Sequence, residues 1–85
     1  MKTRVAVISV IIENTESIES VNQTFSASRD YIIGRMGIPY REKNVNLISI
    51  ALDAPEDVIN TLAGRLGRLN GVSAKTNYSN IITEV

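Results

Sequence analysis

The residue types that carry most protein chemistry are scarce in this chain. It has no cysteine and no histidine, so it lacks thiol nucleophiles, disulfides, imidazole acid–base groups and the usual ligands of zinc. Carboxylates can bind a hard cation such as Mg²⁺ or Ca²⁺, but the acidic residues form no Asp-x-Asp-x-Asp or similar cluster. Neither a Walker loop nor the glycine pattern of a dinucleotide-binding turn is present. We therefore expect no catalytic residues, no metal and no cofactor.

One segment, Asp30–Arg41, combines hydrogen-bond donors with an unusual backbone. Gly34 and Gly37 weaken a strand and indicate a bulge, a bend or a close contact. The donors beside these glycines are Arg35, Tyr40 and Arg41. Arginine pairs well with carboxylate or phosphate. The segment is therefore an ordinary edge strand, an oligomer contact or the rim of an anion-binding site.

The composition describes one small globular domain. The chain has 85 residues, of which 44% are hydrophobic, and its formal net charge is zero. No excess of positive charge favours direct binding to nucleic acid. No segment reaches the roughly 20 apolar residues that span a bilayer. The apolar run near the N-terminus ends in acidic and polar residues without a small-residue cleavage site. We expect a cytoplasmic protein with no nucleic-acid or membrane partner.

The elements that would position these donors follow a repeated pattern. Twice, a strongly apolar run leads into an amphipathic stretch with an acidic start, and a further strand-like segment follows. The six expected elements are Arg4–Ile12, Thr15–Ser28, Tyr31–Tyr40, Val45–Leu52, Pro55–Leu69 and Val72–Tyr78. This order predicts an α+β, ferredoxin-like βαββαβ sandwich with antiparallel sheet order 4-1-3-2 and two helices on one face. We assign residues 1–79 to this domain and residues 80–85 to a C-terminal tail.

The helix starts have recognisable capping residues. Asn14 or Thr15 can cap the first helix, because their side chains accept hydrogen bonds from free backbone N–H groups. For the second helix we expect Asp53 or Ala54 at the cap, with Glu56 as the capping-box partner of Asp53.

Glycines mark the second helix and the turn after it. Gly64 and Gly67 interrupt the helical pattern, which indicates either a weak, early-ending helix or close approach by the backbone of a partner. Asn70-Gly71 then predicts a tight turn into the last strand.

Both faces of the two central strands are mainly apolar. An antiparallel sheet with helices on one side should have one solvated face. Either the small residues on the second face tolerate water, or a partner subunit covers that face. We favour a partner subunit and predict a homo-oligomer, either a dimer or a tetramer. The residues assigned to this interface are Val5, Val7, Ser9, Ile11, Leu47, Ser49, Ala51, Gly34 and Gly37.

Three segments, Asp30–Arg41, Asn46–Pro55 and Gly64–Thr76, carry a resemblance to a known family. They resemble the iron-only hydrogenase system regulators, small bacterial proteins with an ACT-like version of the ferredoxin-like fold. The resemblance covers Arg4–Ser79 and implies transcriptional regulation linked to hydrogenase genes. The fold is similar to the regulatory domain of the nickel-responsive repressor, but the His and Cys ligands of that nickel site are absent. Many ACT domains bind ligand at a Gly-containing acidic loop after the first strand, and here Glu13-Asn14-Thr15 lacks the glycine.

We predict a non-catalytic regulatory or small-molecule-sensing module that acts as an oligomer, with a DNA-binding partner supplying the output. A ligand would lie at a subunit interface, and the residues assigned to it are Arg35, Tyr40 and Arg41 on one side and Glu13 and Asn14 on the other. One alternative is a purely structural oligomerisation module without a ligand. The other is a small acylphosphatase-like enzyme, which would need an arginine in a Gly-rich loop after the first strand, where this chain is acidic instead.

Overall fold

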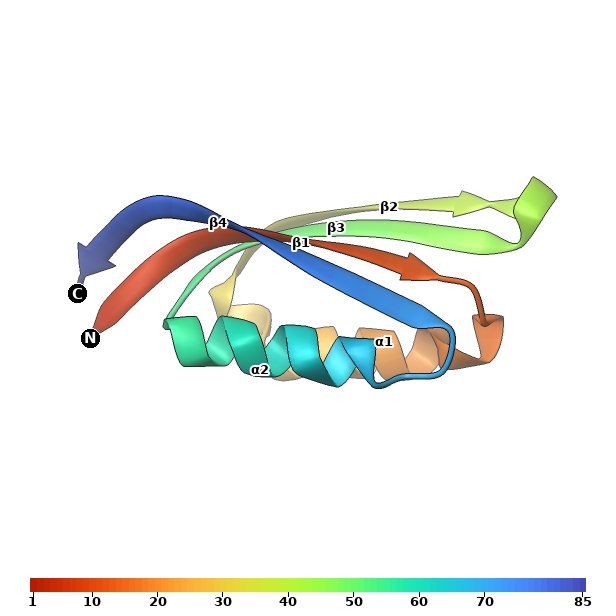
Figure 1. Cartoon of the computed structure of the whole chain (residues 1–85), viewed down its shortest axis with the longest axis horizontal. Helices are drawn as coiled ribbons and strands as arrows, with labels where there is room; N and C mark the ends of the chain where they lie inside the picture. The colour runs from red at the N-terminus through yellow and green to blue at the C-terminus, as the bar shows by residue number, and fades with distance from the viewer.

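The computed structural model describes all 85 residues of the chain. Its helices and strands are β1 (Lys2–Ile12), α1 (Ile18–Ala27), β2 (Ile32–Tyr40), β3 (Val45–Ala54), α2 (Glu56–Gly67) and β4 (Val72–Glu84). Short 3-10 turns are η1 (Thr15–Ser17), η2 (Arg29–Tyr31) and η3 (Arg41–Lys43). All strand pairs are antiparallel, in the order β2-β3-β1-β4. Both helices lie on one face of the sheet (Figure 1). The predicted fold class and sheet order are confirmed.

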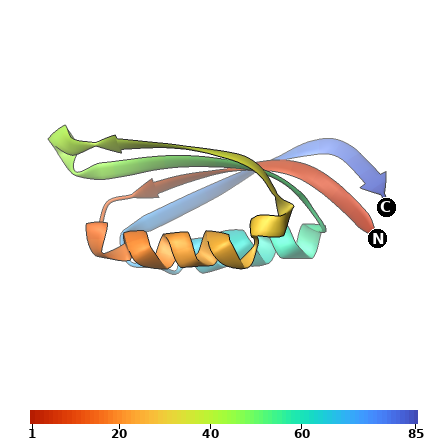
Figure 2. The ribbon, with the colours of Figure 1, turned by 180° about the vertical axis from the view of Figure 1, so that it is seen from behind.

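The hydrophobic core lies between the helices and one face of the sheet (Figure 2). Burial alternates along β1, because successive side chains of a strand point to opposite faces. The fully buried residues of β1 and β3 are Ala6, Ile8, Val10, Ile12, Ile50, Leu52 and Ala54. The helices close this core with Val21 and Phe25 of α1 and with Ile59, Leu62 and Leu66 of α2. These helix residues recur at intervals of three and four, which places them on one stripe of each helix.

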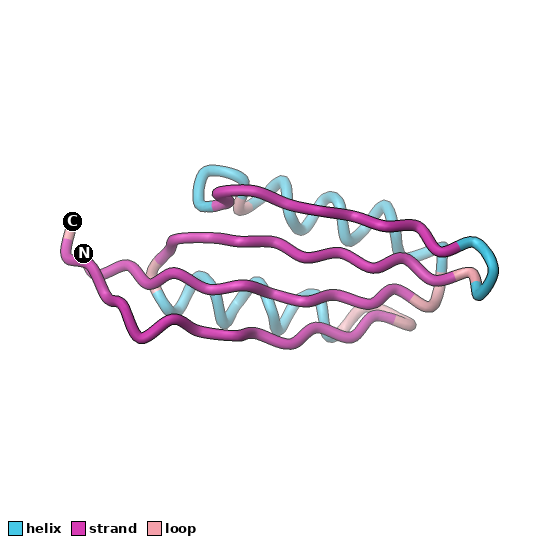
Figure 3. Tube along the Cα trace, turned by 90° about the horizontal axis from the view of Figure 1, so that it is seen from above, coloured by secondary structure: helices cyan, strands magenta, loops and turns pink.

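The sheet is longer than the helices that cover it. Strands of 9–13 residues rise about 3.3 Å per residue, whereas the helices of 10 and 12 residues rise about 1.5 Å per residue. The molecule therefore measures 43 × 18 × 17 Å. The β2–β3 hairpin projects beyond the helices at one end, and β1 and β4 project and curve at the other (Figures 1 and 3).

The last strand continues further than the sequence pattern indicates. β4 runs to Glu84, and its end pairs with the start of β1, for example Thr3 with Thr83. A register shift between Arg4 and Ala6 accommodates the additional residues of β4. Met1 and Val85 exchange two backbone hydrogen bonds of 2.8 and 2.9 Å, so the termini lie side by side (Figure 3). Residues 80–84, expected as a tail, are thus part of the sheet, because β1 supplies free backbone groups to pair with them.

The connections confirm one expected cap and contradict the other. Asn14 caps η1, which leads into α1, and its side chain accepts a hydrogen bond from the backbone N–H of Glu16. The predicted capping box of α2 is wrong: Pro55 occupies the cap position without a side-chain hydrogen bond, because β3 extends through Ala54. Glu56 instead forms an ion pair of 3.1 Å with Arg4.

The second half of the chain has three glycines, two in α2 and one in the turn before β4. Gly64 and Gly67 both lie within α2, which ends at Gly67. The predicted turn at Asn70-Gly71 is confirmed, since Gly71 has a φ of +70° and precedes β4.

Candidate functional site

The sheet face without helices is the main functional candidate, and we call it the open face. Its members on β1, β2 and β3 are Val5, Val7, Ser9, Ile11, Gly34, Met36, Ile38, Tyr40, Val45, Leu47, Ser49, Ala51 and Asp53. Large apolar side chains are exposed there: Leu47 is 41% exposed, Ile11 42% and Ile38 51%. Ile11 pairs with Leu47, and Leu47 pairs with Ile38, so these three side chains form a continuous row across the strands.

The open face is uneven in character. A shallow groove of about 230 Å³ follows the apolar row and is bordered by Met36 and by the small side chains of Ser9 and Ser49. The β4 residues that complete the face are polar: Ser73 pairs with Ile11, Lys75 with Ser9 and Asn77 with Val7. The face thus has an apolar part over β1, β3 and β2 and a polar margin along β4.

All but one of the residues assigned to an interface from the sequence lie on the open face. The exception is Gly37, which pairs with Ile48 on the helix-facing side of the sheet. Sequence reasoning assigned Gly34 of β2 to this face but missed the apolar side chains of that strand, Met36 and Ile38, which are 62% and 51% exposed on the open face. The alternation of apolar residues at 36, 38 and 40 was the available signal.

The five residues assigned to a ligand site do not converge within one chain. Arg35 pairs with Ile50 on the helix-facing side, whereas Tyr40 pairs with Val45 on the open face. The Tyr40 hydroxyl donates a hydrogen bond of 3.0 Å to Glu42. Arg41 lies in η3, at the tip of the β2–β3 hairpin.

Glu13 and Asn14 lie in the connection after β1, at the same end of the sheet as that hairpin tip. The pairing of Ile12 with Asn46, which in turn pairs with Pro39, brings these segments to a common end. Both residues have structural contacts: the Glu13 backbone N–H donates to the Gly71 carbonyl oxygen at 2.7 Å, and Asn14 caps η1. Together the five residues span two faces and one end of the sheet.

Arg35 has a defined environment on the helix-facing side. Its Nη2 donates a hydrogen bond of 3.2 Å to Oδ1 of Asn22 in α1. Its Cζ lies 5.0 Å from the centre of the Phe25 ring, within cation–π range. The two ion pairs of the molecule join Arg4 to Glu56 and the N-terminus to Glu84, so Arg35 has no carboxylate partner.

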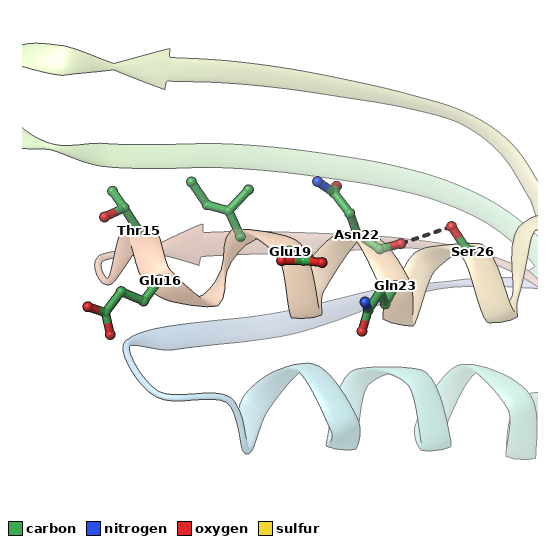
Figure 4. Close-up of a pocket in the computed structure, with 7 residues that line it drawn as sticks. Thr15, Glu16, Glu19, Asn22, Gln23 and Ser26 are labelled. Carbon is green, nitrogen blue, oxygen red and sulfur yellow. Dashed lines mark hydrogen bonds between the residues drawn. The ribbon is translucent and has the colours of Figure 1, made fainter.

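The largest hollow is an open surface along α1 of about 800 Å³. Its lining residues, drawn in Figure 4, are Thr15, Glu16, Ile18, Glu19, Asn22, Gln23 and Ser26. Thr15 and Asn22 point toward the strands, and Glu16 and Gln23 point away from them (Figure 4). All of these residues belong to η1 and α1, so no second element faces them across the hollow. This surface has no enclosed volume in which a reaction could be shielded from water.

Two further features of the structure concern its carboxylates and its helices. No group of three or more Asp or Glu side chains is arranged to hold a metal ion. None of the helices combines the length and the apolar character needed to cross a membrane.

Comparison with known proteins identifies the family. A family model described as "Iron-only hydrogenase system regulator, putative" and named TM1266-like matches residues 4–76. The crystal structure of the uncharacterized protein TM1266 from Thermotoga maritima is similar, with a TM-score of 0.86 and 28% identity over 89% of this chain and 96% of that one. No curated protein matches the sequence.

A second solved structure shares the fold only. A formyltetrahydrofolate deformylase from Pseudomonas putida KT2440 superposes with a TM-score of 0.67 and 14% identity over 91% of this chain. The match spans 30% of the deformylase, so it concerns a part of that enzyme. The resemblance stated from the sequence is confirmed by the family model and by the first structure. This chain belongs to the TM1266-like family of iron-only hydrogenase system regulators.

Proposed function

We propose that this protein is a non-catalytic regulatory module that works as a homo-oligomer, with the open face as the contact between copies. The observation that carries this proposal is the row of exposed apolar side chains Ile11, Leu47 and Ile38. Exposed apolar patches of this kind mark interaction sites in soluble proteins. The family description supports the regulatory role.

A second copy of the chain is the occupant that fits the open face best. Apart from Asp53, which lies opposite Val5 at one end, the apolar part of the face has no charged residue, and the chain as a whole has zero net charge, so two copies have no net repulsion to overcome. Two sheets pack face to face at about 10 Å when their side chains interdigitate. The alternation of large Leu47 and Ile11 with small Ser9 and Ser49 supplies the ridges and hollows for such packing.

Because the domain is small, association with a second copy would add substantially to its stability. A domain of this length buries only about 60–65% of the surface that its unfolded chain exposes. The buried core comprises 13 hydrophobic residues, all on the helix-facing side. A partner on the open face would add a second apolar layer, and the hydrophobic contribution rises by roughly 25 cal/mol for each Å² buried.

The test is the oligomeric state of a variant in which the centre of the open face carries a charge. Leu47→Glu changes a residue that is 41% exposed in the single chain, so the fold should tolerate it. In an assembled state the carboxylate would be desolvated, and we expect association to weaken by at least about 100-fold. Gln23→Glu adds the same charge on the exposed side of α1 and should leave assembly unchanged.

Sedimentation velocity over a wide protein concentration range measures both variants against the wild type. Assembly of the wild type and of Gln23→Glu, with dissociation of Leu47→Glu, would support the proposal. A wild type that is monomeric at all concentrations, or a Leu47→Glu variant that assembles normally, would contradict it. Circular dichroism should confirm that all three proteins keep the same secondary structure.

The two other functional readings are distinguishable by experiment. A purely structural oligomerisation module would assemble identically and bind no small molecule, so saturable binding of a metabolite separates it from a sensor. An acylphosphatase-like enzyme would hydrolyse an acyl phosphate, and we expect no turnover of benzoyl phosphate. The connection after β1 argues against that activity, because Glu13 is acidic and Asn14 is used to cap η1. We expect a separate DNA-binding partner to carry the regulatory output.

A further inference from the structure

We propose that a groove between α1 and β2 binds a small organic carboxylate through Arg35. The groove has a volume of about 230 Å³ and lies on the helix-facing side of β2, away from the open face. Its lining comes from α1, β2 and the neighbouring strands, and the residues on which the argument depends are Ile12, Ile18, Asn22, Arg35, Asn46 and Ile48. None of the residues beyond Arg35 was assigned to a ligand from the sequence.

The groove exists because β2 presents little bulk to α1. Beyond Ile32, which packs against the core at the start of β2, the helix-facing positions are Arg35, Gly37 and Pro39, of which only Arg35 has a long side chain. A Cβ atom added at Gly37 would meet only Ile48 Cγ1, at the ordinary contact distance of 3.9 Å. Packing within the chain therefore does not require a glycine here, and the missing side chain leaves the groove open.

The groove has a cation with no counter-ion. Arg35 is exposed; it donates to Asn22 through Nη2 and stacks on Phe25, and neither contact neutralises the guanidinium. Its remaining N–H donors match the two oxygens of a carboxylate in geometry. The acidic residue of α1 closest in sequence to Asn22 is Glu19, which lines the neighbouring open surface and forms no ion pair with Arg35.

The rest of the lining favours an organic anion over a bare inorganic one. Ile12 is fully buried at the base, and Ile18 and Ile48 are half-buried beside it, which provides an apolar surface. Asn46 also lines the groove, and the asparagines that form side-chain hydrogen bonds within the chain are Asn14, Asn22 and Asn60. The volume is below the roughly 300–1,000 Å³ of pockets for drug-sized ligands. A carboxylate with a short, branched apolar body fits these features.

The groove and the open face share one strand. Along β2, Arg35 and Gly37 face the groove, whereas Met36 and Ile38 face the open side, and Ile38 also lines the groove. A ligand that fixes the groove side of β2 would therefore also affect the strand that presents Met36 and Ile38 to a partner. The inference that the ligand regulates assembly rests on the proposed function, but ligand binding can be tested independently of assembly.

The experiment is a titration of the ¹⁵N-labelled full chain with isovalerate, followed by ¹H–¹⁵N correlation spectra. Isovaleramide, which has the same shape without the charge, is the matched ligand control. We expect saturable shifts at the backbone amide of Gly37 and at the side-chain amides of Asn22 and Asn46, and weaker binding of isovaleramide by about tenfold or more. No saturable shift with isovalerate up to about ten millimolar, a weak affinity typical of very small ligands, or equal binding of the two compounds would overturn the proposal.

Variants locate the site and separate this proposal from the assembly proposal. Arg35→Gln should weaken isovalerate binding by about tenfold or more, and Arg68→Gln, at the C-cap of α2 and outside the groove, should not. Gly37→Val should block the groove while its β-branched side chain suits a strand. Normal binding by either Arg35→Gln or a folded Gly37→Val would refute the site. Repeating the titration on Leu47→Glu shows whether the groove binds isovalerate even when that variant does not assemble.

Discussion

Replacement of Gly71 by alanine should strongly destabilise the protein, because two separate features of the structure require glycine there. Gly71 has a φ of +70°, a conformation that costs an L-residue about 1–2 kcal/mol. An added Cβ would lie 2.6 Å from Asn14 Cβ and 2.8 Å from the Asn14 backbone nitrogen. Relief of such an overlap costs typically about 1–3 kcal/mol. We expect the free energy of unfolding to fall by about 2–4 kcal/mol.

This loss is large because Asn14 cannot move freely. Its side chain caps η1, and the adjacent Glu13 N–H donates to the Gly71 carbonyl oxygen at 2.7 Å. A shift of Asn14 would therefore disturb both the start of the first helical segment and the hydrogen bond that ties it to the turn before β4. For a domain of this size the expected change corresponds to a decrease in Tm of about 10–25 °C.

Gly64→Ala is the matched control with the opposite sign. Gly64 lies inside α2, and an added Cβ would meet only the end of the flexible Arg68 side chain at 3.6 Å. Alanine is favoured over glycine in a helix by about 1 kcal/mol. We expect Tm to rise by about 4–8 °C. Loss of assembly in this variant would instead indicate that a partner backbone approaches Gly64.

Thermal and urea unfolding, followed by circular dichroism at equal protein concentrations, measure both variants, because oligomerisation makes Tm depend on concentration. A Gly71→Ala protein with a Tm within about 2 °C of the wild type would refute the reasoning, since that shift corresponds to less than about 0.5 kcal/mol. A Gly64→Ala protein that is less stable and still assembles would show that the helix interior is more constrained than the structure indicates.

Four further substitutions test individual side chains by the same unfolding measurements. Thr3→Val removes a buried hydroxyl without a hydrogen-bond partner and should stabilise the fold by up to about 1 kcal/mol; a loss would mean that the hydroxyl has an unrecognised partner. Asn14→Ala removes the cap of η1 and should cost about 1 kcal/mol, whereas unchanged stability would show that the cap is dispensable. Arg4→Met removes hydrogen bonds to the Ser79 carbonyl (2.6 Å) and to Glu56 (3.1 Å) and the stacking on the Tyr78 ring, and should cost about 1–3 kcal/mol. Glu56→Gln should cost less than about 1 kcal/mol, because Glu56 is exposed; equal losses in these two variants would contradict a role for the Ser79 and Tyr78 contacts.

The sequence by itself determined the order of the elements, the fold class and the apolar character of both sheet faces. These properties are local: the apolar run along Val5–Ile12 and the helical spacing of Val21 and Phe25 depend on neighbouring residues only. The absence of cysteine and histidine is equally a property of composition, and it excluded whole classes of chemistry without reference to the structure.

Only the tertiary structure decided which face of the sheet each β2 residue points to. Successive residues of a strand point to opposite faces, so Arg35 and Tyr40 lie on different faces of the sheet. The prediction that assigned both residues to one ligand site did not use this alternation. Which residue faces the helices depends on the register shift between Ile32 and Gly34, and that shift is defined only by pairing with β3. The α1–β2 groove follows from the same register, because it places Gly37 and Pro39 opposite α1.

The extent of β4 and the start of α2 were likewise decided by long-range contacts. Residues 80–84 have no pattern that distinguishes a strand from a tail, and they become a strand because the start of β1 offers them unpaired backbone groups. Asp53 has the sequence context of a helix cap, but its pairing with Val5 keeps it in β3, and Glu56 turns to Arg4 instead. In each case a partner distant in sequence, with its own backbone or charge to satisfy, overrides the local preference.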